Sequence, residues 1–190
     1  MLFNTGVLEE FLEDYHKETY GHEIAKKLRQ NQKTISLKLK KLEEQKILTS
    51  RIIGKTTLYK LNQENENVKD FLVVAEINKK MKFLEEHQVI KELTKNLEGI
   101  IGIFGSYTKK ENKESSDIDI FIINGSGKKI LEKAKKFEFP IDVKKFTEKE
   151  FKNLLKNKDS LISEIVENHV LINGAEPFVN YLWKHYYGFN

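Results

Sequence analysis

A Gly-Ser pair and two closely spaced acidic residues are the features of this sequence best suited to phosphate chemistry. Gly105 and Ser106 end an apolar run, and ten residues separate them from Asp117 and Asp119. A second apolar run follows Asp119, so we expect a strand that begins near Asp117. Because side chains alternate between the two faces of a strand, both carboxylates then project on the same side.

Two adjacent carboxylates repel each other unless a cation lies between them. We therefore expect a divalent ion that prefers oxygen ligands, above all Mg²⁺, at Asp117 and Asp119. A strand that ends in Gly105 and Ser106 leaves backbone N–H groups and a hydroxyl that suit phosphate oxygens. Together these features predict a site for a nucleoside triphosphate with its Mg²⁺.

The spacing of this motif, with strand-like residues on both sides, resembles the active-site signature of the DNA polymerase β superfamily. The small size of the segment points to the minimal nucleotidyltransferase branch, and the resemblance covers residues 83–170. It implies a third carboxylate on a following strand. Asp142 lies in such a strand-like run; a surface aspartate is the alternative interpretation.

The resemblance implies a role for each residue of the motif. Asp117, Asp119 and Asp142 become the catalytic residues and the ligands of two Mg²⁺ ions. Gly105 and Ser106 become the nucleotide-binding residues. The implied reaction transfers a nucleotide from ATP or another nucleoside triphosphate to a hydroxyl acceptor, with loss of pyrophosphate.

Small nucleotidyltransferases of this branch commonly act as antitoxins that adenylylate a HEPN-type ribonuclease. The resemblance therefore implies such a toxin as a partner, with a protein hydroxyl or an RNA end as the acceptor. The chain departs from the family pattern at Lys110, where the family often has Gly in the loop over the phosphates.

Positive charge is concentrated in the first third of the chain. Residues 21–61 contain eleven Lys and Arg against three Asp and Glu, whereas residues 62–190 contain 21 of each kind. This distribution predicts a polyanion as the partner of the first third. A basic face that is merely solvated is the alternative.

The same third has a helix, helix, turn, helix, hairpin order. Apolar spacing predicts helices over residues 4–17, 21–30 and 33–45, and Gly54 with Lys55 predicts a hairpin turn. The segment resembles the bacterial and archaeal winged-helix transcriptional regulators. The resemblance implies double-stranded DNA as the partner and these DNA-binding residues: Lys33, Thr34, Ser36, Leu37, Lys38, Lys41, Arg51 and Lys55.

A winged helix used only for protein contacts is the alternative to DNA binding. Because winged helices usually act on paired half-sites, the resemblance also predicts a homodimer. A regulator that keeps the nucleotidyltransferase fold as a nucleotide sensor, without turnover, is the alternative to an enzyme.

The remaining segments complete an α+β two-domain fold. We expect a winged helix-turn-helix domain over residues 1–62, a helical connector over 63–82, and a nucleotidyltransferase domain with a mixed sheet and flanking helices over 83–190. The periodicity of residues 68–97 predicts one long helix or two helices with a break near 79–87. Further helices are expected at 148–157, at 159–172 and from Glu176.

Composition excludes several classes of protein. Without cysteine, the chain has no disulfide, thiolate zinc site or cysteine nucleophile, and its five histidines show no ligand spacing. No apolar run approaches the length of a membrane span, and the acidic N-terminal segment is unlike a signal peptide. We therefore expect a cytoplasmic protein without a membrane segment.

Overall fold

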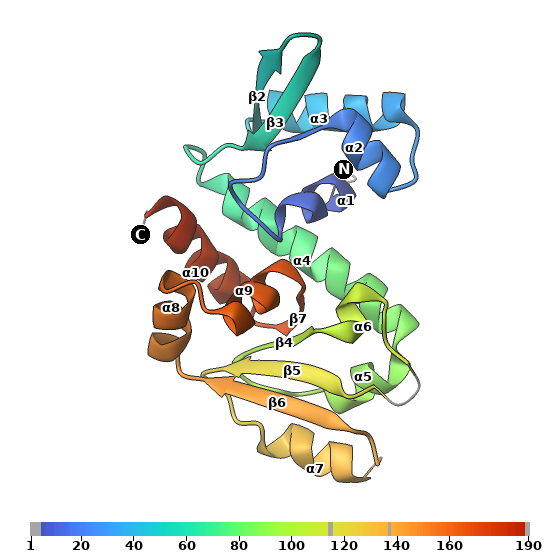
Figure 1. The fold of residues 1–190 in the computed structure, drawn as a ribbon, viewed down its shortest axis with the longest axis vertical. Helices are drawn as coiled ribbons and strands as arrows, with labels where there is room; N and C mark the ends of the chain where they lie inside the picture. Colours follow the sequence, from blue (N-terminus) through green and yellow to red (C-terminus); the bar gives the residue numbers. More distant parts are fainter. Residues whose placement is uncertain (1–4, 114–115, 137, 189–190) are drawn as a thin grey trace. The chain divides into compact units, whose positions relative to one another are not determined.

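The structure is a computed structural model that describes residues 5–113, 116–136 and 138–188. The chain divides into two compact units (Figure 1). The first unit contains the residues up to Asn78 and those from Leu182 onward, and the second contains Lys79–Tyr181. Both units combine helices with a sheet, which confirms the predicted mixture of α and β structure.

The first unit consists of short helices and a small antiparallel sheet with strand order β1-β3-β2. Its elements in chain order are α1 (Thr5–Leu8), the 3-10 helix η1 (Glu9–Phe11), β1 (Thr19–Tyr20), α2 (Gly21–Lys27), α3 (Gln32–Glu44), β2 (Leu48–Ile53), β3 (Thr56–Leu61), the start of α4 (Asn67–Glu86) and the end of α10 (Ala175–Tyr187). Strands β2 and β3 pair around Gly54, which has a φ of +60°, so the predicted hairpin is confirmed.

Helix α3 buries one stripe of apolar side chains and exposes its lysines, except Lys38, which is partly buried. Ile35, Leu39 and Leu42 are buried, as the apolar spacing predicts. The Asn31 side chain accepts a hydrogen bond of 2.8 Å from the Lys33 amide and caps the helix. The cap fixes where the helix begins and therefore which residues face solvent.

The predicted helix over residues 4–17 is wrong in its second half. Within the described part of this segment, α1 and η1 end at Phe11. The Asp14 side chain then accepts a hydrogen bond of 2.8 Å from the His16 amide. Such an Asx turn competes with helical hydrogen bonds. The apolar side chains of Leu12 and Tyr15 are buried nevertheless.

The second unit is built on a mixed sheet with strand order β6-β5-β4-β7. Its elements in chain order are the end of α4, α5 (Gln88–Leu93), β4 (Ile100–Phe104), α6 (Ser106–Lys109), β5 (Ile118–Ile123), α7 (Lys128–Lys136), β6 (Ile141–Phe146), α8 (Glu148–Lys156), α9 (Ser160–Glu167), β7 (Val170–Asn173) and the start of α10. Strand β4 is antiparallel to β5 and β7, and β5 is parallel to β6.

Strand β5 is the central element for the site. Ile118, Ile120 and Ile122 belong to one buried cluster that also contains Ile130 of α7. The intervening residues point to the other face, where the ring of Phe121 lies 5.9 Å from that of Phe178 in α10. Asp119 therefore projects from the face opposite α7.

Two helix predictions meet the structure differently. The break predicted near residues 79–87 is confirmed, because α4 ends at Glu86 and α5 begins at Gln88. The helix predicted over 159–172 is wrong at its end. There α9 stops at Glu167, and Val170–Asn173 forms β7, which pairs with β4. The pairing partner lies about 70 residues earlier in the chain, so local periodicity does not reveal it.

Helix α10 packs as predicted around apolar side chains, with Phe178 and Leu182 fully buried. Phe189, which continues its apolar spacing, lies outside the described residues. Among the helices of the described ranges, none combines the length and hydropathy needed to cross a membrane.

Candidate active site

The Gly-Ser pair forms the turn between β4 and α6. Gly105 has a φ of +74° and a ψ of −144°, a backbone conformation that favours glycine. A Cβ atom at this position would lie 2.2 Å from Oδ2 of Asp119. The carboxylate of Asp119 therefore lies directly against the Gly105 backbone, and the two halves of the predicted motif meet.

The third predicted acid lies on the neighbouring strand. In the parallel pairing of β5 with β6, Asp119 is the direct partner of Asp142. Partners in register project on the same face of a sheet, so the two carboxylates are neighbours. Asp117 precedes β5 and is exposed. The structure thus brings Gly105, Asp119 and Asp142 together and leaves Asp117 at the rim.

A fourth carboxylate, that of Glu164, acts on Asp119 in addition to the two other predicted aspartates. Partial burial, and then the negative charges of Asp142, Glu164 and Asp117, raise the pKa of Asp119, and the ammonium group of Lys144 opposes them. Glu164 lies on α9. The sequence predicts the helix that contains Glu164, but it does not indicate that Glu164 lies near Asp119. Sequence reasoning therefore missed Glu164 as a residue of the site.

Two lysine side chains accompany the carboxylates. Nζ of Lys144 lies 2.9 Å from Oδ2 of Asp142, and Nζ of Lys109 lies 2.7 Å from Oε1 of Glu164. All four side chains are partly exposed, so each ion pair adds little to stability. Their main effect is to offset part of the negative charge at the site.

The donor types suit a hard cation, but the structure does not gather three of them tightly. Among residues 5–113, 116–136 and 138–188, no three His, Cys, Asp or Glu side chains form a group that could hold a metal ion as arranged. Carboxylate oxygens in register beside the Gly105 cradle nevertheless fit Mg²⁺ with a nucleotide. Ligation by Asp117, Asp119 and Asp142 stays a prediction.

The segment that follows Gly105 is the short helix α6 with Lys110 as its C-cap, and side-chain contacts hold it in place. Oγ1 of Thr108 lies 2.8 Å from the carbonyl oxygen of Gly105 and 2.7 Å from the carbonyl oxygen of Asn168. The second contact links α6 to the end of α9. Lys110 has a φ of 59° and a ψ of 33°, the left-handed conformation that Gly favours. The departure from the family pattern at Lys110 therefore keeps a glycine-like backbone, and its ammonium group pairs with Glu86 at 3.2 Å.

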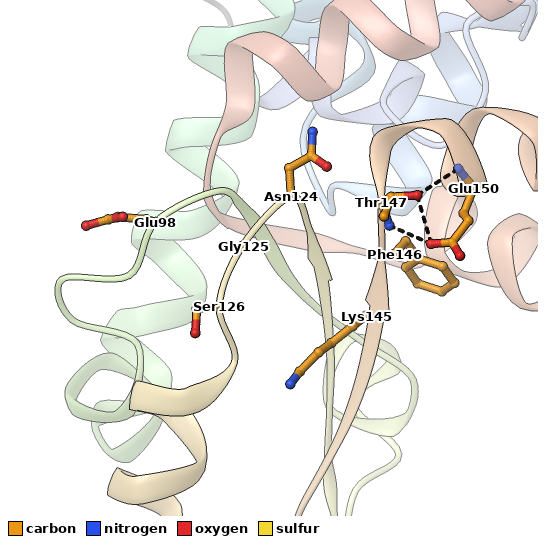
Figure 2. Close-up of a pocket in the computed structure, with 8 residues that line it drawn as sticks. All are labelled: Glu98, Asn124, Gly125, Ser126, Lys145, Phe146, Thr147 and Glu150. Carbon is orange, nitrogen blue, oxygen red and sulfur yellow. Dashed lines mark hydrogen bonds between the residues drawn. The ribbon is translucent and has the colours of Figure 1, made fainter.

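A separate pocket of about 480 Å³ lies at the carboxyl ends of β5 and β6. Figure 2 shows its lining, which includes Asn124, Ser126 and Lys145 and the reciprocal hydrogen bonds between Thr147 and Glu150. None of the predicted site residues lines it. Asp119 lies near the start of β5, so the pocket and the acidic site lie toward opposite ends of the strand.

The predicted DNA-binding residues lie on α3 and on the hairpin of the first unit. All are exposed except Lys38, which is partly buried and donates a hydrogen bond of 2.8 Å to Gln30. The guanidinium group of Arg51 donates hydrogen bonds to the carboxylate of Glu18. A pocket of about 440 Å³ between α3 and the hairpin is lined by Ser36 and Lys55, and also by Tyr20, His22 and Tyr59, which sequence reasoning missed.

Comparison with known proteins agrees with this geometry. Residues 87–177 match the family model described as "Polymerase beta, Nucleotidyltransferase". This segment, just under half of the chain, contains the Gly-Ser turn and all three predicted aspartates. This part of the second unit is therefore similar to nucleotidyltransferases, in agreement with the prediction. Neither a curated protein nor a solved structure matches the chain.

Proposed function

We propose that this protein is a Mg²⁺-dependent nucleotidyltransferase that transfers a nucleotide from ATP or another nucleoside triphosphate to a hydroxyl acceptor. One observation carries the proposal: the Asp119 carboxylate lies against Gly105 inside a segment similar to nucleotidyltransferases. A phosphate-binding turn and a metal-binding acid are then close enough to act on one triphosphate.

Each residue has a distinct task in the proposed reaction. The backbone of Gly105 and the hydroxyl of Ser106 orient the β- and γ-phosphates. Asp117, Asp119 and Asp142 would hold Mg²⁺, which when bound offsets the charge of the phosphates. The Asp142 carboxylate, on the strand beside Asp119, is placed to take up the proton of the acceptor hydroxyl. Attack on the α-phosphorus then expels pyrophosphate.

The first unit is proposed to be a winged helix-turn-helix that binds double-stranded DNA. The exposed cations of α3 and the β2–β3 hairpin support this proposal, since phosphate contacts supply most of the affinity of such modules. Arg51 is paired with Glu18, so this ion pair must open before the guanidinium group of Arg51 can contact a DNA phosphate.

The acceptor is proposed to be a hydroxyl of a HEPN-type ribonuclease, which would make the protein an antitoxin that also regulates transcription. This step rests on the resemblance to small nucleotidyltransferases. A homodimer acting on paired half-sites completes the proposal.

The reaction is tested by incubating the protein with ATP, Mg²⁺ and candidate acceptors and measuring pyrophosphate. The proposal expects release that disappears in an Asp117→Ala/Asp119→Ala variant. Release that persists in this variant at the wild-type rate would contradict the assigned site.

A nucleotide sensor without turnover is the second candidate. The observation that favours it is the pairing of Asp142 with Lys144, which competes with metal ligation. Saturable ATP binding with no pyrophosphate release for any acceptor, and a DNA affinity that changes with ATP, would support the sensor instead.

A further inference from the structure

The charges around Asp119 fall short of what two magnesium ions need. The groups involved are the carboxylates of Asp117, Asp119, Asp142 and Glu164 and the ammonium group of Lys144. Before the nucleotide binds, four negative charges and one positive charge give these side chains a formal net charge of −3, so one divalent ion leaves them close to neutral, whereas two ions leave them net positive. The sum leaves out Lys109, Glu111 and Glu167, because none of the three is among the charges that act on Asp119.

The position of Lys144 gives this balance a structural basis. Lys144 follows Asp142 by two residues on β6, so both side chains project on the face that also carries Asp119. Its ammonium group lies 2.9 Å from the Asp142 carboxylate and also acts on the charge of Asp119. A positive charge that belongs to the protein therefore already lies beside the Asp142 carboxylate, on the face of the sheet that carries the predicted ligands.

The neighbouring Lys145 provides a contrast within the same strand. It points to the opposite face, where a Cβ atom on Gly127 would lie 2.5 Å from Lys145 Cε. It forms no ion pair at the acidic site among the described side chains. The two lysines are thus equal in charge and adjacent in sequence, but only Lys144 lies beside the carboxylates.

We propose that the Lys144 ammonium group takes the place of a second metal ion, so that the site binds its nucleotide with one divalent cation rather than two. This inference rests on the proposed function, since it concerns the same site. Lys144 acts as a positioning residue through Asp142. It holds that carboxylate on β6 and repels any further cation.

Replacing Lys144 by an uncharged residue then creates a second cation site. A doubly charged ion near an ammonium group at about 4 Å experiences a repulsion that weakens its binding about tenfold or more, even at the dielectric constant of water. Lys144→Met removes this repulsion and the ion pair with Asp142, so that the Asp142 carboxylate can also contact a second ion. Because Lys144 is partly exposed, the methionine variant is expected to fold, and its thermal unfolding midpoint checks this.

The experiment counts Mn²⁺ ions bound to the full chain by electron paramagnetic resonance, with α,β-methylene-ATP as a nucleotide that cannot lose pyrophosphate. The expected result is one tightly bound Mn²⁺ per chain for the wild type, for Lys145→Met and for Lys144→Arg. Lys144→Met is expected to bind two ions, the second at least about tenfold more tightly than in the wild type.

Two ions of similar affinity in the wild type, or one ion in a folded Lys144→Met variant that still binds the analogue, would overturn this inference alone. Failure of the wild type to bind the analogue with Mn²⁺ at all would overturn the proposed function as well, so the two failures are distinguishable.

Discussion

Gly105 has two independent physical requirements for glycine. Its φ of +74° is strained for any residue with a side chain, and a Cβ atom would collide with the Asp119 carboxylate. The sequence indicates that a Gly-Ser pair precedes two acids, but it does not indicate that the first Gly touches the second acid. That contact comes from the pairing of Phe104 with Asp119 across β4 and β5.

Gly105→Ala is expected to lower the free energy of unfolding by about 1–3 kcal/mol and to weaken ATP binding at least about tenfold, because the new methyl group displaces Asp119. Chemical denaturation and calorimetric titration with ATP and Mg²⁺ measure the two effects. Gly6→Ala is the matched control, since Gly6 has open space around its Cβ position. An alanine at residue 105 that leaves ATP affinity unchanged would contradict the assigned contact.

Asp119 gives the site a defined dependence on pH. Because burial and neighbouring carboxylates raise the pKa of Asp119 above 3.8, its ionisation costs more in the folded state than in the unfolded state. The stability associated with the protonated group is fully present below pH 3.8 and is lost as the pH rises through the folded-state pKa.

Asp119→Asn mimics the protonated group at every pH. Without added metal, the variant is expected to be more stable than the wild type at pH 7, and this gain shrinks toward zero as the pH falls to 3.8. Urea unfolding between pH 3 and pH 7 measures the difference. A variant that is less stable than the wild type at pH 7 would show that Asp119 is stabilising and that the repulsion is not there.

At the scale of elements, the sequence predicts those helices and strands whose formation depends on the local spacing of apolar residues. The amphipathic helix α3, the hairpin at Gly54 and the strand after Asp117 are confirmed because their apolar spacing matches their burial. The same reasoning misses β7 because its partner strand is distant in the chain. It misses Glu164 because a helical pattern shows which face is apolar but not which polar residue meets the site.

The loop after Ser106 yields a prediction for its backbone. Lys110→Gly is expected to leave the free energy of unfolding unchanged or to raise it by up to about 1 kcal/mol. Glycine relieves the left-handed conformation, while the loss of the exposed ion pair with Glu86 costs little. Thermal unfolding measures the change. Lys109→Gly, one residue earlier and within α6, is expected to destabilise; equal effects at both positions would contradict the assignment.

At the scale of the whole molecule, charge and chemistry are divided between two units. The cationic excess lies in residues 21–61, whereas the Gly105–Ser106 turn and the acids lie in the second unit. Composition and motif spacing predict this division. The sequence cannot predict how the net charge of the acidic site is balanced, because Lys109 and Lys144 look like ordinary surface lysines until their carboxylate partners are known.

DNA binding by the first unit is expected to depend steeply on salt. Replacing Lys38 and Lys41 by Ala is expected to reduce the slope of log K against log salt by about 2, since each phosphate contact contributes about 0.9. Fluorescence anisotropy with a labelled duplex at several salt concentrations measures the slope. The matched control replaces Lys156 and Lys158, exposed lysines of the second unit. Equal slopes for both double variants would contradict a DNA surface on α3.

The central claim is that the Gly105 turn and the acids of β5 and β6 transfer a nucleotide rather than a phosphoryl group. The most direct measurement compares ATP labelled at the α-phosphorus with ATP labelled at the γ-phosphorus, using Mg²⁺ and the candidate ribonuclease acceptor. For the wild type we predict covalent retention of the α-label and none of the γ-label, and for Asp119→Ala we predict retention of neither label. Transfer of the γ-label, or retention of the α-label by the Asp119→Ala variant, would contradict the account.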